Sequence, residues 1–397
     1  MTRWPVAAYT MASALGLGMA AHAHALHAGT SGLRRQRFET THFDAWLGLV
    51  AGVDDVVLPE PLRAFDCRNN RLAWLGLQAD GFASRVRAAA YRYGPHRVAV
   101  FVGTSTSGIL QTELAYRRRD PATGALPAEL LYATTHNTYS AARYLRERLA
   151  LQGPAAVVST ACSSSAKVFG QAARMIELGL IDAAVVGGVD SLCLTTLYGF
   201  HALELVSTDI CRPWDAQRKG LSIGEAAAFA LLERDADRPA AWLLGCGESS
   251  DGHHMSAPHP EGAGAALAIR QALAQAGRRA DEVGYVNLHG TGTPGNDAAE
   301  DRGVSAVFGT TLPCSSTKGY TGHTLGAAGG VEAAICLLAM QHGWLPPTLN
   351  LRKPDPTLKL PVLREPRHTR PRVVASNSFG FGGTNACLLF GAPEVAA

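Results

Sequence analysis

One pattern occurs twice in this chain: an apolar, β-type run ends in a loop of small residues that leads directly into helix-forming sequence. The first copy is VVSTACSSS, residues 157–165, and the second is PCSSTKGYTGH, residues 313–323. Strands that alternate with helices in this way favour βαβ units and a parallel sheet. Because both copies share the same order, the pattern predicts an α/β chain made of two similar halves.

The rest of the chain supports this alternation. Short apolar runs predict strands, and apolar residues at helical spacing predict helices. The expected strands are 5–10, 97–102, 155–159, 183–187, 226–233, 241–245, 283–288, 312–317, 373–376 and 386–390. The expected helices are 20–27, 139–149, 164–178, 264–276 and 326–340. A polar, turn-like patch at 235–239 separates the two series, so we expect an N-terminal unit at 1–236 and a C-terminal unit at 237–397.

The first 25 residues allow two interpretations. An apolar run at 6–20 followed by HAHA imitates a secretory signal peptide. However, Tyr9, Thr10 and Ser13 interrupt the run, and nothing downstream is typical of a disulfide-rich exported protein. We therefore expect a buried strand, a turn at 14–18 and the start of a helix, and no transmembrane segment, since no other stretch has roughly 20 unbroken apolar residues.

Charge and cysteine content exclude several classes of function. The 36 Lys and Arg residues nearly balance the 33 Asp and Glu residues, and a dispersed net charge of +3 does not predict binding to nucleic acid. None of the eight cysteines forms a CxxC pair or lies at zinc-ligand spacing with histidine, so we expect no metal site and reduced thiols in a cytoplasmic protein.

Cys162 is the strongest candidate for a reactive thiol. It follows an expected strand and immediately precedes helix-forming sequence, which places its sulfur at a helix N-terminus. The helix dipole and free N–H groups there favour the thiolate and are expected to lower the pKa. Cys162 is therefore predicted to be a nucleophile, with an inert core cysteine as the alternative.

Two histidines follow expected strands in loops rich in glycine and threonine. His289 lies in VNLHGTGTPGND, where it could donate to a developing oxyanion or act as a general base, and Thr291 and Thr293 offer hydroxyls beside it. His323 lies five residues after Lys318, and a nearby like charge disfavours the imidazolium form. Either histidine alone is more often structural.

A glycine-rich turn near the end of the chain could complete such a site. In SNSFGFGGTNAC, residues 376–387, three glycines surround Phe379 and Phe381. An N–H group from this turn could form an oxyanion hole together with the N–H of Cys162. A plain glycine-rich hairpin is the alternative.

These motifs together resemble the β-ketoacyl-acyl carrier protein synthases, in particular the elongating, two-histidine type of the thiolase superfamily. The matching stretches are STACSSS, NLHGTGTPGND, STKGYTGH and SNSFGFGGTNA, in the order of the family, with support from RPWDAQRKG and DGHHMSAPHPEGAG. The resemblance extends over nearly the whole chain. It implies a thiolase-like, five-layered α/β/α/β/α fold built from two similar halves.

The resemblance also implies a set of catalytic roles. Cys162 would carry an acyl group as a thioester, with its carbonyl oxygen held by the N–H groups of Cys162 and Phe381. His289 and His323 would support decarboxylation of malonyl carrier protein and stabilise the enolate. Lys318 would orient His323.

Further residues are implied to support catalysis or to bind substrate. Glu332 resembles the buried acidic residue of the family, and Phe381 resembles a gate for malonyl entry. The expected substrate-binding residues are Thr291 and Thr293 on the phosphopantetheine arm, and Phe200 and Phe379 at the acyl pocket.

The implied reaction is a decarboxylative Claisen condensation in fatty acid, polyketide or aryl-polyene type biosynthesis. It needs no cofactor other than the phosphopantetheine of the acyl carrier protein, which is the expected partner. We expect a homodimer in which strands near the nucleophile pair, with a heterodimer with a related subunit as the alternative. Two other functions stay open: a non-catalytic chain-length subunit of a ketosynthase heterodimer, and a thiolase or acyltransferase of different chemistry.

Overall fold

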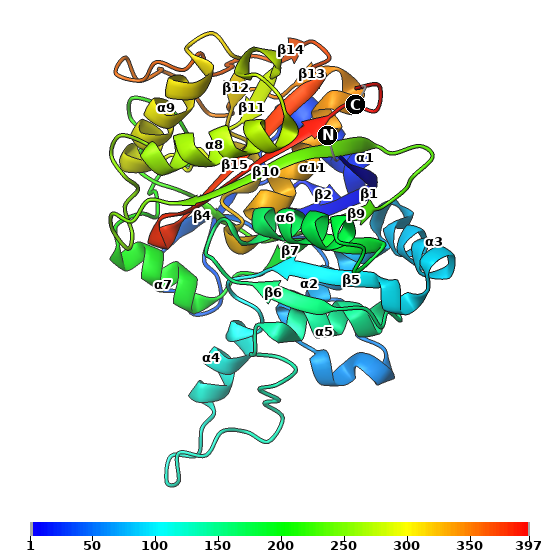
Figure 1. Cartoon of the computed structure of the whole chain (residues 1–397). Helices are drawn as coiled ribbons and strands as arrows, with labels where there is room; N and C mark the ends of the chain where they lie inside the picture. Colours follow the sequence, from blue (N-terminus) through cyan, green and yellow to red (C-terminus); the bar gives the residue numbers. More distant parts are fainter. Residues whose placement is uncertain (1–2, 396–397) are drawn as a thin grey trace.

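The computed structural model describes residues 3–395 and centres on a mixed eleven-stranded sheet (Figure 1). The strands follow the order β12-β11-β15-β16-β10-β1-β9-β7-β5-β6, and β2 pairs with β1 off this path. The strands are β1 (Trp4–Ser13), β2 (Gly16–Leu17), β5 (Val98–Gly103), β6 (Ala155–Val158), β7 (Ala183–Asp190), β9 (Ala226–Glu233), β10 (Ala241–Ser250), β11 (Tyr285–Asn287), β12 (Cys314–Ser315), β15 (Val373–Gly380) and β16 (Thr384–Gly391).

The sheet consists of two halves with the same topology. In the first half β1, β5, β6, β7 and β9, numbered one to five along the chain, lie in the order 3-2-4-5-1. The second half, β10, β11, β12, β15 and β16, has the same order, and corresponding pairs are parallel or antiparallel alike. The first strands of the two halves, β1 and β10, pair antiparallel and join them. The prediction of two similar halves is confirmed.

Helices cover both faces of each half. They are α1 (Gly18–His27), α2 (Arg68–Gln78), α3 (Phe82–Tyr93), α4 (Ile109–Arg117), α5 (Tyr139–Arg148), α6 (Ser164–Glu177), α7 (Leu194–Ala202), α8 (Ala263–Ala276), α9 (Pro294–Phe308), α10 (Lys318–Thr321) and α11 (Ala328–His342). Short 3-10 helices occur at Glu60–Phe65, Ala79–Gly81, Pro95–Arg97, Ala280–Glu282, Leu325–Ala327 and Phe381–Gly383. Two small sheets complete the chain: β3 (Arg34–Gln36), β4 (Ala45–Gly48) and β8 (Ile223–Gly224), and β13 (Trp344–Leu345) with β14 (Arg367–His368).

Three buried clusters show the five layers. Helices α2, α3 and α5 pack on the outer face of the first half, and α8 and α9 on the outer face of the second half. Helices α6 and α11 lie between the halves and share one apolar cluster with strands of both. The thiolase-like α/β/α/β/α fold expected from the resemblance is confirmed.

Small residues allow the two central helices to pack closely. A Cβ atom added to Gly329 of α11 would lie 2.7 Å from the backbone nitrogen of Ala166 in α6. The segment Leu325–His342, which includes α11, is long and apolar enough for a membrane span, but 89% of it is buried inside the molecule. Its apolar surface is therefore that of a core helix, and no other described helix meets the criteria.

The sequence-based elements agree with the structure in type, with two kinds of difference. Strands β7, β10 and β15 run several residues beyond their expected ends, because the ladders of their neighbours continue. The elements that were not predicted are helices α2, α3, α4, α7, α9 and α10 and the short strands β3, β4, β8, β13 and β14. At the N-terminus, the expected strand, turn and helix are present as β1, β2 and α1.

Candidate active site

Cys162 lies in a tight turn between β6 and α6. The turn passes through Ala161, whose φ of 52° lies in the left-handed region that costs energy for a residue with a side chain. Local hydrogen bonds fix it: Thr160 N–H donates to Ser164 Oγ (2.9 Å), and that hydroxyl donates to the carbonyl of Ala161 (2.5 Å). The turn holds the Cys162 sulfur at the wall of a cavity, with 6% of the residue exposed.

The expected low pKa of Cys162 is wrong. Burial raises the pKa of the thiol to about 12, and the positive charge of Lys318 and the N–H of Phe381, which both lower it, do not compensate. A helix N-terminus is a weaker influence here than the loss of solvent. The resting thiol is therefore neutral, and its ionisation requires a base.

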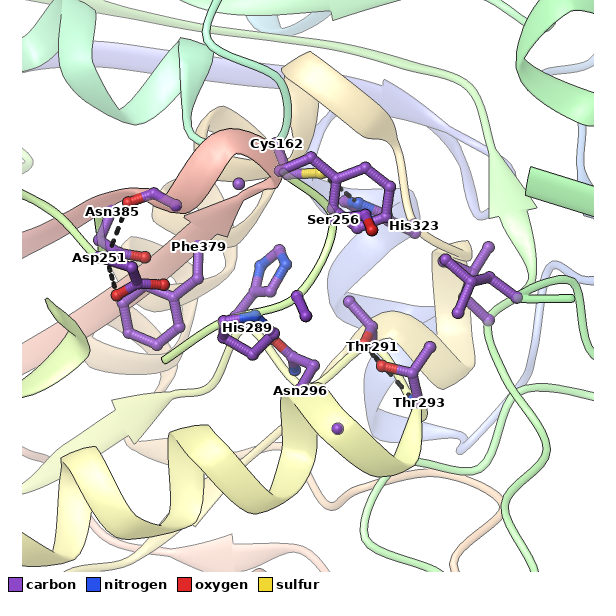
Figure 2. Close-up of a pocket in the computed structure, with 18 of the residues that line it drawn as sticks. Cys162, Asp251, Ser256, His289, Thr291, Thr293, Asn296, His323, Phe379 and Asn385 are labelled. Atoms are coloured by element: carbon purple, nitrogen blue, oxygen red, sulfur yellow. Dashed lines mark hydrogen bonds between the residues drawn. The ribbon is translucent and has the colours of Figure 1, made fainter. Parts of the chain in front are cut away.

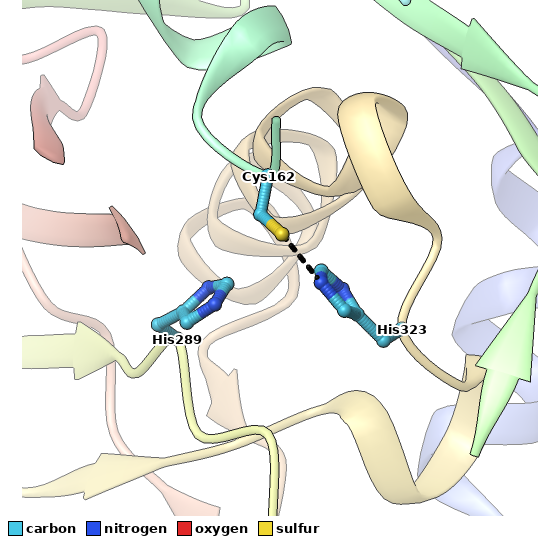
Figure 3. A group of neighbouring side chains, drawn as sticks. All are labelled: Cys162, His289 and His323. Atoms are coloured by element: carbon cyan, nitrogen blue, oxygen red, sulfur yellow. Dashed lines mark hydrogen bonds between the residues drawn. The ribbon is translucent and has the colours of Figure 1, made fainter. Parts of the chain in front are cut away.

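His323 is the imidazole in contact with the Cys162 thiol. Its Nε2 lies 2.9 Å from Cys162 Sγ (Figure 3). Burial first, and then the charge of Lys318, lowers the pKa of His323 well below its usual value. A neutral ring at this distance can accept the thiol proton.

Lys318 contacts His289 and not the expected His323. Its Nζ lies 3.3 Å from His289 Nδ1 and also donates to the backbone carbonyl of His289 and to the Glu332 carboxylate. Burial and the Lys318 charge lower the pKa of His289 well below its usual value. Lys318 therefore orients His289 directly and acts on His323 only through its charge.

The two imidazole rings lie close together at the cavity, in an edge-to-face arrangement. The ring centres of His289 and His323 are 5.3 Å apart, and the ring planes are nearly perpendicular at 87°. Figure 3 shows both rings turned toward the Cys162 sulfur. A thioester carbonyl on that sulfur would lie within reach of two neutral nitrogen groups.

Glu300 is a positioning residue that the sequence analysis missed. From α9 it accepts hydrogen bonds from the backbone N–H groups of His289 (2.8 Å) and Gly290 (2.7 Å) and from Asn377 Nδ2 (3.2 Å). It is 1% exposed, and burial raises its pKa to about 7. In the sequence, this role could have been suspected from a glutamate in the helix that follows the GTGTPGND motif.

The predicted substrate-binding residues line the same cavity, whose volume is about 230 Å³ (Figure 2). The Thr291 and Thr293 hydroxyls are 2.9 Å apart. The rings of Phe200 and Phe381 have centres 5.5 Å apart, and Phe379 lies 5.9 Å from the His289 ring. The structure thus brings all four residues, together with Phe381, to one site.

Other lining residues were not predicted. Asp251, Ser256, Asn296 and Asn385 add polar groups to the cavity wall. Asp251 accepts a hydrogen bond from Asn385 Nδ2 (2.9 Å), and its own N–H donates to the carbonyl of Gly383 (2.8 Å). These contacts connect the strand end of β10 to the glycine-rich turn.

The glycine-rich turn lies directly against the nucleophile. A Cβ atom on Gly380 would lie 2.8 Å from the Thr160 carbonyl and 3.2 Å from the Cys162 nitrogen. The N–H of Phe381 hydrogen-bonds toward the Cys162 sulfur. The turn at residues 380–381 therefore lies beside the backbone nitrogen of Cys162, where the expected oxyanion hole would form.

One group of side chains has closely spaced metal-ligand atoms. Cys162, His289 and His323 have ligand atoms within 4.8 Å of one another, and within residues 3–395 they form the one such group of three or more.

Comparison with known proteins agrees with this geometry. Residues 72–238 match the family described as "Beta-ketoacyl synthase, N-terminal domain", and residues 240–352 match "Beta-ketoacyl synthase, C-terminal domain". A 3-oxoacyl-[acyl-carrier-protein] synthase 2 from Vibrio cholerae is 33% identical over 92% of this chain and 93% of its own length. A mitochondrial 3-oxoacyl-[acyl-carrier-protein] synthase from Arabidopsis thaliana is 41% identical over 63% of this chain, which corresponds to 59% of the plant protein.

A solved structure extends the likeness to nearly every residue. A chain from the complex of a ketosynthase with its chain length factor, from Xenorhabdus doucetiae, superposes with a TM-score of 0.88 and 38% identity and covers 98% of both chains. Sequence family, fold and the grouping of a cysteine with two histidines all agree. The chain therefore belongs to the β-ketoacyl synthase family of acyltransferases.

Proposed function

We propose that this β-ketoacyl synthase elongates an acyl chain by two carbons, with Cys162 as the nucleophile and His289 and His323 as the groups that handle protons and the enolate. The observation that carries this proposal is the 2.9 Å contact between Cys162 Sγ and His323 Nε2, in a cavity that His289 also lines. A buried thiol with a raised pKa gains its nucleophilicity from a base at that distance.

The first half-reaction transfers the acyl group. Cys162 loses its proton to His323 and attacks the carbonyl of an acyl thioester on the acyl carrier protein. The N–H groups of Cys162 and Phe381 stabilise the negative oxygen of the intermediate. The phosphopantetheine thiolate leaves and takes up a proton, so that the acyl group becomes a thioester on Cys162.

The second half-reaction forms the carbon–carbon bond. A malonyl thioester loses carbon dioxide, and the enolate oxygen that results lies against the nitrogen atoms of His289 and His323. The enolate carbon attacks the Cys162 thioester, and the cysteine thiolate leaves and is protonated. Lys318 and Glu332 hold His289 in place throughout, and the product is a β-ketoacyl carrier protein two carbons longer.

The cavity wall supports the proposed substrate contacts. The hydroxyls of Thr291 and Thr293 can hydrogen-bond the amides of the phosphopantetheine arm, and the rings of Phe200 and Phe379 offer apolar contact for the acyl chain. The ring of Phe381 is tilted at 43° against that of Phe200 and lies beside the nucleophile, where its movement would open or close the route between the two substrates.

A second β-ketoacyl synthase-like chain is the proposed structural partner, either a further copy or a related subunit. Strand β6 forms the edge of the large sheet, and all four of its residues are half-buried in the isolated chain. The segment around α4 extends from the body and exposes Tyr116, Leu131 and Tyr132 (Figure 1). The similar Xenorhabdus structure is a complex of a ketosynthase with its chain length factor, and it supports the related-subunit form.

A non-catalytic chain-length role is the second candidate, since the solved relatives include ketosynthase and chain length factor complexes. The presence of the thiol and both histidines at contact distance favours the catalytic role over it.

The deciding experiment is intact-protein mass spectrometry with a panel of acyl carrier proteins, followed by malonyl carrier protein. We expect an acyl adduct on the wild type and none on Cys162→Ala, and discharge of the adduct as a product two carbons longer. The same experiment is done with this chain alone and with a related subunit added. Comparing the two distinguishes a homodimer from a heterodimer. Equal labelling of both variants, or no labelling under either condition, contradicts the elongation proposal.

A further inference from the structure

Four histidines surround a second cavity, outside the active site. Its volume is about 320 Å³. The lining residues are Ala23, His24, His27, Leu338, His342, Trp344 and His368. The lining thus combines four imidazoles with an apolar floor and contains no carboxylate, lysine or arginine.

The histidines come from three separate parts of the fold. His24 and His27 lie in the last turn of α1, three residues apart and therefore on the same helix face. His342 is the final residue of α11, and His368 lies in β14 directly opposite Trp344 of β13. Residues more than 300 positions apart in the sequence therefore converge on this cavity.

The spacing of the rings suits a shared ligand. The rings of His27 and His368 have centres 6.4 Å apart at 67°, and His27 packs 5.5 Å from Trp344. With nitrogen–metal bonds of about 2.1 Å, two imidazoles on one ion have centres roughly 5 to 6.5 Å apart. No three of these four histidines have ring nitrogens within 4.8 Å of one another in the structure, so a shared ion requires their exposed side chains to rotate toward one point.

The ring nitrogens at this cavity are available. No hydrogen bond or ion pair within residues 3–395 involves the side chains of His24, His27, His342 or His368. By contrast, His42 contacts the hydroxyl of Tyr198, His136 contacts that of Thr112, and His254 and His259 accept from nearby backbone N–H groups.

Two helix ends at this cavity favour a cation, and Arg370, which lies close to Gly343 just after α11, opposes one. Both α1 and α11 end at this cavity, at His27 and His342, and the C-terminus of a helix carries partial negative charge. Neutral imidazole nitrogens are ligands for borderline-soft divalent ions, whereas Mg²⁺ and Ca²⁺ prefer oxygen.

We propose that His24, His27, His342 and His368 form a binding site for a borderline-soft divalent cation such as Zn²⁺, Ni²⁺ or Cu²⁺. The ion would link the end of the first helix to the end of the central helix α11 and to the β13–β14 pair. This site is separate from the Cys162 group and does not depend on the proposed reaction.

The test measures Ni²⁺ binding by isothermal titration calorimetry in a Cys162→Ala background. That background weakens the other group with metal-ligand spacing, so that the remaining binding reports on the four histidines. We expect about one Ni²⁺ per chain. Adding His24→Ala/His27→Ala should weaken binding at least about tenfold, and so should His342→Ala/His368→Ala, which changes different elements.

A matched histidine pair provides the control. His42 and His201 are also exposed and also have ring centres 6.4 Å apart, but they lie elsewhere. The His42→Ala/His201→Ala change should leave the affinity unchanged. Absence of binding, equal affinity in all variants, or loss in the control pair alone would overturn the proposal.

Thermal unfolding provides a second measurement. A ligand that binds only the folded state raises Tm. Ni²⁺ should raise the Tm of Cys162→Ala by a few degrees, and EDTA should reverse the change. The same addition should leave the Tm of the His24→Ala/His27→Ala variant unchanged, and an equal rise in that variant would contradict the site.

Discussion

The loop between β6 and α6 and the loop between β12 and α10 occupy corresponding places, because each follows the third strand of its half. Both are rich in serine and threonine, yet they deliver different chemistry. The first presents Cys162, whereas the second presents Lys318 at the start of α10 and His323 just after it. In the proposed reaction, the same topology thus provides the nucleophile in one half and a proton-handling group in the other.

The two loops also differ in the interactions that hold their reactive side chains in position. Cys162 is held by backbone geometry, with a left-handed residue before it and short hydrogen bonds around it. Lys318 is held by charge, through the buried Glu332 on α11. Changes in the first loop should therefore alter reactivity, whereas changes in the second should alter both stability and reactivity.

Removing the nucleophile is the largest test of this division. Cys162→Ala should lower condensation by a factor of about 10⁴ or more with little change in stability, because the thiol forms a bond that no other group can form. Acyl-adduct formation measured by mass, with Cys246→Ala as the cysteine control, checks this. Full activity in Cys162→Ala would contradict the assignment of the nucleophile to the first loop.

The histidines should separate the two half-reactions. His323→Ala removes the base in contact with the thiol and should slow acyl loading about 10²- to 10⁴-fold. His289→Ala should leave loading nearly unchanged and slow the step with malonyl carrier protein. Single-turnover rates for each half-reaction provide the measurement, and equal slowing of loading by both changes would show that the histidines act as one unit.

Breaking the buried ion pair should affect folding. Lys318→Met leaves the Glu332 carboxyl buried without its partner and should lower the free energy of unfolding by about 3–5 kcal/mol. The double change Lys318→Met/Glu332→Leu should recover part of that loss without recovering activity. Urea unfolding of the two variants measures this difference. If the double variant is no more stable than the single one, the ion pair with Glu332 is not what holds Lys318 in position.

Glu300 provides a smaller, pH-dependent test. Its pKa in the folded chain is about 7, above the ordinary value of about 4.3, so the folded state binds more protons between these values. Its contribution therefore makes stability fall as pH rises from about 4.5 to 7. Glu300→Gln should reduce that slope by up to about 1.4 kcal/mol per pH unit, measured by unfolding at several pH values, and an unchanged slope would contradict the raised pKa.

The sequence predicted the fold class and the grouping of the motifs, because alternation and strand-end loops are local features. It did not predict the partner of Lys318. Parallel pairing aligns Asn287 of β11 with Ser315 of β12, which brings His289 level with the start of α10, whereas α10 carries the chain from Lys318 away to His323. Sequence proximity was therefore a poorer guide than strand register.

The pKa of Cys162 was mispredicted for a related reason. A helix N-terminus can be recognised from residues next to the cysteine, but burial depends on segments far along the chain, including the turn at 380–383. Glu300 was missed because its role depends on the tertiary contact with the His289 turn. Helices α2, α3, α4, α7, α9 and α10 were also missed, although α2 and α3 have clear apolar faces.

The position of β1 has a consequence for how the chain is made. Apart from the two-residue strand β2, its neighbours in the sheet are β9 and β10, so β1 is synthesised more than 200 residues before either of these partners exists. At ordinary rates of synthesis that delay is roughly ten seconds or more. An apolar strand that lacks its main partners for so long is a target for chaperones, and β1 takes its place in the middle of the sheet only after β9 and β10 have been made.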